Sequence, residues 1–305
     1  MKRSLFIPVL LGLLLSGPQW ILGALEIEGV LGVGNMNFDP EDSGGESIVN
    51  ELSYLGYLNL KGDFFEKAEY NVRFERDSFF KNTISAKFSI DLDYLYMEFG
   101  PFLGIWDEPG LSFSDRISGG FDSPDAGIMG GVKLAYPGVV FMGLKGSSTL
   151  NFQRGSMGNN FRESAEINVG FWLPHVIPTF SASIKTFTRP SDDIITHYEL
   201  TRLWASADIF AKNIPLLLRV DFGWEILKRS AENNHTEELL DEHELWAMFA
   251  GVQARWQVSK PWRLIAGMEI PIFAWTEKPP PAKNLSKNLF FYYQFYAGAA
   301  WTYLK

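Results

Sequence analysis

The sequence has no cysteine among its 305 residues. This absence excludes a disulfide scaffold, a thiolate metal site, a cysteine nucleophile and lipid attachment through an N-terminal cysteine. Positive charge is also scarce, because 27 Lys and Arg stand against 36 Asp and Glu. We therefore expect no nucleic-acid partner, since binding a polyanion depends on clustered cations that release the phosphate counterions.

Long apolar runs are missing after residue 24, where no stretch approaches the roughly 18 uninterrupted apolar residues of a membrane-spanning helix. A membrane protein built from helices is thereby excluded. The sequence also lacks a Gly-rich phosphate loop, a His-Glu-x-x-His metal motif and a nucleotide fingerprint. We therefore assign no catalytic residue, no metal ligand and no cofactor. The 46% apolar and 15% aromatic composition, broken often by Gly and Pro, favours an all-β chain.

The first 24 residues have the layout of a secretory signal peptide. Lys2 and Arg3 precede an apolar run over residues 5–15, and the small residues Gly23 and Ala24 follow as a cleavage edge. A retained membrane helix is the alternative interpretation, but the prolines and the glycine inside the segment weaken it. We therefore expect a signal peptide at residues 1–24 and a mature chain of residues 25–305.

Hydrophobicity alternates with a period of two along much of the mature chain. Within residues 67–77, Ala68, Tyr70, Val72 and Phe74 share one face, and charged or amide side chains fill the other. The same pattern returns over residues 84–94. Such segments exceed the usual globular strand of about 5–6 residues and match the roughly 9–11 residues of a tilted strand that crosses a bilayer.

Short turns alternate with longer polar connections along the chain. The turns lie at residues 62–65, 100–101, 136–138, 173–178, 212–215 and 259–261. The longer connections lie at residues 39–50, 107–125, 152–162, 189–198, 229–243 and 276–288, with a shorter one at 78–83. This alternation predicts an up-and-down meander. Its fourteen predicted strands are residues 25–37, 51–61, 67–77, 84–98, 102–106, 126–135, 139–149, 163–172, 179–188, 199–211, 216–227, 244–257, 262–274 and 289–303.

The two faces of these strands differ in residue type. In the strands near residues 180–184, 216–224 and 246–256, the apolar face carries no charge. A soluble β-sandwich would alternate too, but aromatic rings gathered at strand ends favour the headgroup girdles of a membrane barrel. The predicted girdle residues are Tyr54, Tyr94, Trp224, Trp246, Trp256, Trp262, Trp301 and Tyr303. We therefore predict one all-β domain, a closed up-and-down antiparallel transmembrane β-barrel of about 14 strands, within about 12–16, because lipid tolerates no open sheet edge.

Across its mature length the chain resembles the bacterial outer-membrane β-barrels, and in size and strand number the monomeric fourteen-stranded porins. Its leader runs directly into the strand at residues 25–37, unlike the fatty-acid transporter barrels, which carry an N-terminal plug. The Gly-Pro and Pro-Gly hairpins resemble those of spirochaete barrels. The last strand ends at Lys305, which departs from the terminal Phe or Trp of the family. The resemblance implies a diderm bacterium, an outer-membrane location, membrane lipid and the barrel-assembly machinery as partners, and a monomer rather than a trimer.

Charged side chains fill the face opposite the apolar one. The predicted pore-lining residues are Arg73, Glu75, Lys87, Asp91, Asp93, Lys185, Arg202, Asp208, Arg219, Asp221, Arg255, Arg263 and Glu269. Such a wall needs water or ionic partners, so the lumen is either a hydrated channel or is sealed by ion pairs. We favour passive diffusion of small polar solutes, with a weak cation preference that arises from the acidic connections.

Two other functions stay open. A membrane-embedded hydrolase would use acid–histidine pairs, and His197 lies near two aspartates while His235 and His243 lie beside the acidic cluster of residues 237–244. The same cluster has the oxygen-rich composition that suits weak binding of Ca²⁺. A surface adhesin or a structural barrel would act through its long connections, which hold no recognisable motif.

Overall fold

The computed structural model describes residues 24–36, 53–77, 79, 81–106, 122–150, 160–190, 194–212, 214–275 and 292–303. These residues form fourteen antiparallel strands. The strands are β1 (Leu25–Met36), β2 (Ser53–Phe65), β3 (Ala68–Asp77), β4 (Lys81–Asp91), β5 (Leu95–Trp106), β6 (Asp122–Tyr136), β7 (Val140–Thr149), β8 (Phe161–Phe171), β9 (Val176–Pro190), β10 (Ile194–Phe210), β11 (Leu216–Asn233), β12 (Leu239–Gln257), β13 (Trp262–Trp275) and β14 (Tyr292–Tyr303). The predicted signal peptide lies outside the described residues except for Ala24.

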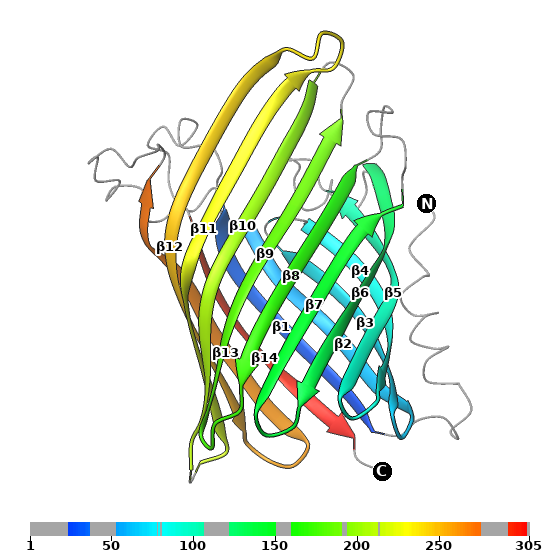
Figure 1. The fold of residues 1–305 in the computed structure, drawn as a ribbon, viewed down its shortest axis with the longest axis vertical. Coiled ribbons are helices and arrows are strands. Elements are labelled where there is room, and N and C mark those ends of the chain that lie inside the picture. The colour runs from blue at the N-terminus through cyan, green and yellow to red at the C-terminus, as the bar shows by residue number, and fades with distance from the viewer. Residues whose placement is uncertain are drawn as a thin grey trace, which may run out of the picture.

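Each strand pairs with the next one in the sequence, and β14 pairs with β1 to close the barrel (Figure 1). The closing register places Leu25 opposite Tyr303 and Met36 opposite Tyr292. The predicted closed up-and-down barrel of fourteen strands is confirmed, and with it the resemblance to outer-membrane barrels in architecture. Within the described residues, no helix is long and apolar enough to cross a membrane.

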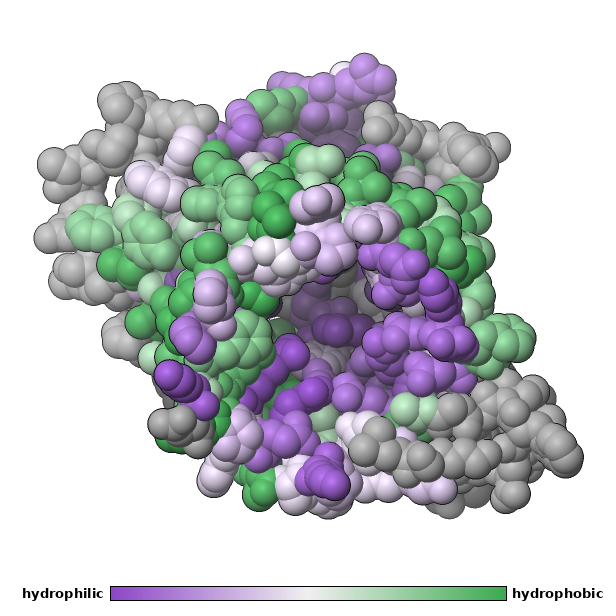
Figure 2. All heavy atoms as spheres, turned by 60° about the horizontal axis from the view of Figure 1, so that its bottom comes forward, coloured by the Kyte–Doolittle hydropathy of each residue, from purple (hydrophilic) through white to green (hydrophobic). Residues whose placement is uncertain are grey.

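The apolar side chains of the alternating strands point away from the barrel axis. Leu58 on β2, Leu203 on β10 and Phe222 on β11 expose 53%, 61% and 46% of their surface. Figure 2 shows hydrophobic residues around the outside of the barrel and hydrophilic residues in its hollow. A soluble sandwich would bury the apolar face instead, so this arrangement is typical of a wall that faces lipid.

One predicted turn is wrong. Gly100 and Pro101 lie inside β5, and the chain turns at residues 92–94 instead. Asp93 has a positive φ of 68°, a conformation that aspartate tolerates, and its backbone N–H donates to the Asp91 carboxylate at 3.0 Å. Pro101 offers no N–H, and the β4–β5 register is interrupted opposite it, between the pairs Ser85–Phe102 and Phe88–Phe99.

Asp93 is therefore in a turn and not in a strand, which corrects its predicted place in the pore lining. Its carboxylate accepts a hydrogen bond from Lys67 of the neighbouring turn at 3.0 Å. This contact raises the pKa of the Lys67 ammonium, because the carboxylate favours the charged form.

Two predicted long connections are in fact mostly strand. β9 continues to Pro190 and β10 begins at Ile194, while β11 continues to Asn233 and β12 begins at Leu239. The Asn233 side chain closes the second of these turns, because its amide oxygen accepts the backbone N–H groups of His235 and Thr236 at 2.9 and 3.0 Å. β10, β11 and β12 have 17, 18 and 19 residues, so they rise above the other strands (Figure 1).

The outer face of these long strands changes from apolar to polar within one register row. One row of side chains that point outward across β9–β12 is mostly apolar and consists of Ile184, Thr201, Ile226 and Trp246. The next row towards the tips contains Thr186, Glu199, Lys228 and Glu244. The apolar band therefore ends between these rows, and the strand ends beyond it lie in water.

We expect a charge on the apolar face to destabilise the barrel and a charge on the inner face to be tolerated. Val220→Arg places a guanidinium at the middle of the apolar stretch of β11, which should lower the free energy of unfolding by about 2–4 kcal/mol. The matched variant is Ser206→Arg, whose side chain lies opposite Asp221 on the inner face. Reversible unfolding in lipid vesicles measures both, and equal losses would contradict the assignment of the faces.

Candidate functional site

The inner wall of the barrel carries the predicted pore-lining side chains. Apart from Asp93, all of them lie in strands, on the face opposite the exposed apolar residues. Seen from the end where the short turns lie, hydrophilic residues surround an open hollow (Figure 2). The charges on this wall form several local centres.

Arg202 organises the first centre. From β10 it contacts Glu225 of β11 at 3.2 Å and Glu269 of β13 at 2.7 Å, and its guanidinium stacks over the Phe249 ring at 4.0 Å from the centroid. The Glu225 side chain is only 6% exposed. A buried carboxylate of this kind needs a charged partner, because desolvation without one is costly. Arg202 supplies that partner for two acids at once.

Arg263 organises the second centre, beside the closing strands. It donates to Glu28 at 2.7 Å and to Glu26 at 3.0 Å, although β14 lies between β13 and β1. The Tyr57 hydroxyl donates to the same Glu28 carboxylate at 2.5 Å. Arg73 in turn lies over the Tyr57 ring at 4.1 Å. The contacts therefore run continuously from β13 to β3.

Arg73 ends this chain of contacts in a bidentate pair. Its Nη2 and Nε atoms donate to the Glu75 carboxylate at 2.7 and 3.0 Å. Two parallel bonds of this type fix the guanidinium in orientation as well as in position. The arginine is thereby held flat against the wall, over Tyr57.

Small residues allow partners on alternate strands to meet. Ala300 of β14 stands in the register row between Arg263 and Glu28, so no bulky side chain separates them. Gly267 of β13 stands likewise between Gln253 and Tyr296, whose side chains form a hydrogen bond of 3.0 Å. A Cβ at Gly267 would collide with the tyrosine ring. Glycine and alanine therefore shape the polar network of the wall.

The remaining lining residues also have neighbours along the wall. Lys87 pairs with Glu98 at 2.9 Å, and Arg219 pairs with Asp208 at 2.6 Å. Arg255 donates to Gln253 at 3.0 Å. Asp221 lies opposite Ser206 and Gly251 in the register rows. These contacts follow the wall and do not cross the lumen, so they balance its charge and leave the hollow open.

The outer end of the lumen is different, because contacts cross it there. Lys185 of β9 contacts Asp77, the last residue of β3, at 3.3 Å. Arg162 of β8 donates to the Thr83 hydroxyl of β4 at 3.0 Å. The strands β4–β8 lie between β3 and β9 one way round the barrel, and β10–β14 with β1 and β2 lie between them the other way. The contact between Lys185 and Asp77 therefore joins nearly opposite walls, and the contact between Arg162 and Thr83 spans the three strands β5–β7.

Phe79 occupies the same level of the lumen. It lies in the connection between β3 and β4, and only 5% of it is exposed. It packs with Phe187, Leu200 and Leu227, which come from β9, β10 and β11. Tyr198 and Leu245 pack against the same cluster. An apolar cluster thus fills part of a lumen whose wall is otherwise polar.

A buried ion pair supports this region. Arg162 contacts Asp125 of β6, and their side chains are 2% and 0% exposed. The Thr149 hydroxyl of β7 bonds with the Arg162 backbone at both N–H and C=O, at 3.0 and 3.2 Å. Gly104 leaves the space for this pair, because a Cβ there would collide with both partners.

The predicted site residues do not include Phe79, Asp125 and Arg162. These three residues fall in predicted polar connections, where charges are usually solvated. Two phenylalanines, Phe79 and Phe80, stand in this short and otherwise polar connection, and they are the one signal in the sequence that indicates an inward-pointing ring. The pair of Arg162 and Asp125 left no such signal.

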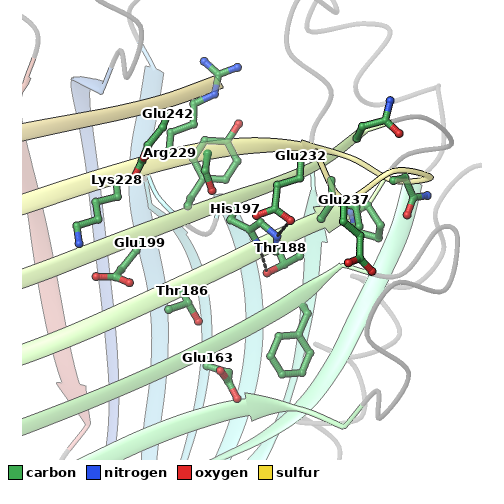
Figure 3. A pocket seen from close by; sticks show the side chains of 17 residues that line it. Glu163, Thr186, Thr188, His197, Glu199, Lys228, Arg229, Glu232, Glu237 and Glu242 are labelled. Atoms are coloured by element: carbon green, nitrogen blue, oxygen red, sulfur yellow. Dashed lines mark hydrogen bonds and ion pairs between the residues drawn. The ribbon is translucent and has the colours of Figure 1, made fainter. Parts of the chain in front are cut away.

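A separate hollow lies on the outer face of the long strands, beyond the apolar band. Its volume is about 840 Å³. Its acidic lining residues come mainly from β8, β10, β11 and the β11–β12 turn, and they are Glu163, Glu199, Glu232, Glu237 and Glu242, with Lys228 and Arg229 as cations. In Figure 3, His197 points toward Thr188 and Glu232.

The histidines show no hydrolytic arrangement among the described side chains. His197 Nδ1 lies 3.0 Å from the Thr188 hydroxyl, but its Nε2 lies 3.9 Å from Glu232, beyond hydrogen-bond distance. The side chains of His197 and Glu232 are 41% and 40% exposed, so water screens their contact. His235 lies in the exposed β11–β12 turn, and the His243 side chain lies outside the described part.

The acidic cluster at residues 237–244 is not arranged as a metal site in the part that the structure describes. No group of three His, Asp or Glu side chains is placed there to hold a metal ion. The Asp241 side chain lies outside that part. Weak Ca²⁺ binding by this cluster, an alternative that the sequence leaves open, is therefore not tested by the described side chains.

The predicted girdle residues take several positions. Trp256, Trp262 and Tyr303 are about half exposed near the short turns, as Tyr94 is in the β4–β5 turn. Trp224 is exposed within the apolar band of β11. The remaining three are Trp246, whose ring N–H donates to Glu244, Trp301, which packs on Tyr303 at 6.1 Å, and Tyr54, whose side chain lies outside the described residues.

Comparisons with known proteins give distant similarities only. No family model and no curated protein matches the chain. An outer membrane channel from Pseudomonas putida F1 aligns with a TM-score of 0.48 and 10% identity, over 94% of this chain and 99% of that one. OmpT, an outer membrane protein of Vibrio cholerae, aligns with a TM-score of 0.41 and 6% identity, over 92% and 97%. A mutant of the Rh. blastica porin aligns with a TM-score of 0.34 and 10% identity, over 92% and 99%.

These identities are too low to assign a function, so we argue it from the residues of this chain. The likeness of its hairpins to those of spirochaete barrels stays a prediction, as does the monomeric state.

The Arg202 centre should be far more important for stability than an exposed pair on the same wall. Arg202→Ala leaves Glu225 and Glu269 without their cation, which should cost about 3–5 kcal/mol of unfolding free energy. Lys145→Ala removes an ion pair with Glu166, in which the N···O distance is 3.9 Å and the lysine side chain is 57% exposed. This change should lower the free energy of unfolding by about 0–1 kcal/mol. Denaturant titration in lipid vesicles compares them, and a similar cost for both variants would refute the assignment.

Proposed function

We propose that the barrel is an outer-membrane channel for passive diffusion of small polar solutes. The observation that carries this proposal is the hollow of the barrel, which hydrophilic residues line and which opens at the short-turn end (Figure 2). Below the outer end of the lumen, the ion pairs of Arg202, Arg219 and Arg263 run between strands at most three positions apart, so they satisfy the charges without filling the space between opposite walls. Such a lumen holds water.

The location of the protein in a cell follows from the need of the barrel for both lipid and water around its outer face. The exposed apolar side chains need lipid, and the polar ends of β9–β12 need water beyond it. We infer residence in a bacterial outer membrane, with removal of residues 1–24 on export and insertion by the barrel-assembly machinery. A single copy closes its own sheet, so the barrel needs no strand from a second copy, and we propose that it works as a monomer.

The channel should carry a small current with a weak cation preference. Pairing balances most charges of the described wall, so selectivity would come mainly from the acidic residues near 39–46, 107–122 and 237–242. Planar-bilayer recording of the refolded protein under a KCl gradient measures the conductance and the reversal potential. Heat-denatured protein serves as the blank.

Two results would reject the channel. One is clear anion selectivity. The other is the absence of current from folded protein, both in the wild type and in a Phe79→Ala variant that removes the ring from the outer end of the lumen.

We propose no catalytic role for the histidines. His197 is half exposed, its hydroxyl neighbour is the secondary alcohol of Thr188, and no carboxylate lies within hydrogen-bond distance of it among the described residues. We expect no hydrolysis of ester or peptide substrates above the blank. Activity that is lost in His197→Ala and kept in His175→Ala, a change in a short turn at the opposite end, would overturn this expectation. A surface adhesin would bind ligand through its loops without conducting ions.

A further inference from the structure

We propose that Phe79 and the Asp77–Lys185 ion pair form a constriction at the outer end of the lumen, and that this constriction sets the conductance and the size limit of the channel. The inference rests on the channel function proposed above. It assigns to three residues the selection of solutes by size, a role that does not follow from the charges of the wall or from the number of strands.

The contacts themselves show that the lumen is narrowed at this level. Asp77 and Phe79 belong to the β3 end of the wall, whereas Lys185, Leu200 and Leu227 belong to β9, β10 and β11 on the far side. In an open cylinder of fourteen strands, side chains of these strands would be separated by water, since barrels of about sixteen strands hold an aqueous channel and barrels of about eight have filled interiors. Direct contact here means that Asp77 at the end of β3 and the Phe79 ring reach across the lumen.

The chemistry of the contact suits a barrier to hydrated solutes. Phe79, Phe187 and Leu227 are 5%, 1% and 7% exposed, so water does not reach the surfaces that they share. Apolar constrictions oppose permeation because an ion or a sugar must shed hydration water to pass them. The polar wall nearer the short turns offers no such barrier. We therefore place the rate-limiting segment of the channel at Phe79.

The position of Phe79 is braced on both sides. Before it, Asp77 is held by Lys185 at 3.3 Å. After it, Thr83 accepts a hydrogen bond from Arg162, which is itself fixed by the buried Asp125. Because Asp77 is tied to β9 on the far wall and Thr83 is tied to β8, the ring is held in the lumen by more than its own packing.

Removal of the ring tests the constriction. Phe79→Ala should raise the single-channel conductance at least about twofold, because the narrowest segment dominates the resistance. In liposome-swelling assays, the same variant should reduce the difference in rate between a monosaccharide and a trisaccharide. The matched control is Phe141→Ala, which removes an inner ring of β7 that packs on Trp172 at 5.0 Å near the short turns. That control should conduct as the wild type does.

Charge exchange tests the brace separately. Asp77→Lys and Lys185→Asp each place like charges together and should release the connection, which raises the conductance. The double variant restores an attractive pair and should return the conductance toward the wild-type value. Heat-modified migration in electrophoresis verifies that each variant is folded.

The outcomes separate the constriction from the channel itself. A wild type that conducts, with no change in Phe79→Ala and in both charge variants, would overturn the constriction and leave the channel intact. A silent wild type with a conducting Phe79→Ala variant would support both. Silence of every folded variant would reject the channel and the constriction together.

Discussion

The pairing of every strand edge is the constraint on which the rest of the structure depends. Hydrocarbon offers no water to an unpaired amide or carbonyl, so a sheet in lipid must close on itself, and β1 and β14 provide that closure. Their register also decides which residues face the lumen. A shift by one residue would turn Glu26 and Glu28 of β1 into lipid and break their contacts with Arg263. The register of β1 with β14 therefore serves two purposes. It pairs the backbone N–H and C=O groups of both strands, and it directs the charged side chains towards the lumen.

Small residues in the inner wall allow its charged side chains to reach one another. Long side chains can bridge alternate strands only where the intervening residue is small, as at Ala300 between Arg263 and Glu28. The network of Arg202 with Glu225 and Glu269 likewise stays on one side of the barrel. Because these charged side chains find partners along the wall, they form no ion pairs across the lumen. The exceptions, Asp77 with Lys185 and Arg162 with Thr83, are confined to the outer end, where the lumen narrows.

Much of the fold could be predicted from the sequence, because lipid and water impose a period of two on a strand that separates them. The alternation in residues 67–77 predicted β3, the sequence of short turns and long connections predicted fourteen strands, and the cost of an open sheet edge in lipid predicted the closed topology. The signal fails where both faces meet water. The ends of β10–β12 carry polar side chains on both faces, so the pattern predicts loops at residues 189–198 and 229–243 where the strands in fact continue. It also fails at Pro101, which predicts a turn but lies in a strand where the β4–β5 register is interrupted. It fails again at Asp93, where a local hydrogen bond to Asp91 forms the turn. Contacts between distant strands, such as Phe79 with Leu227, depend on the closed geometry and carry no local signature.

The unequal heights of the strands have a consequence for access. β9–β12 stand above the rest of the described wall, so the rim that the described strands form is oblique (Figure 1). The outer face of these raised strand ends is polar. The described barrel therefore has a front and a back, because a molecule that approaches from the side of β9–β12 meets polar strand ends that the other described strands do not raise to that height.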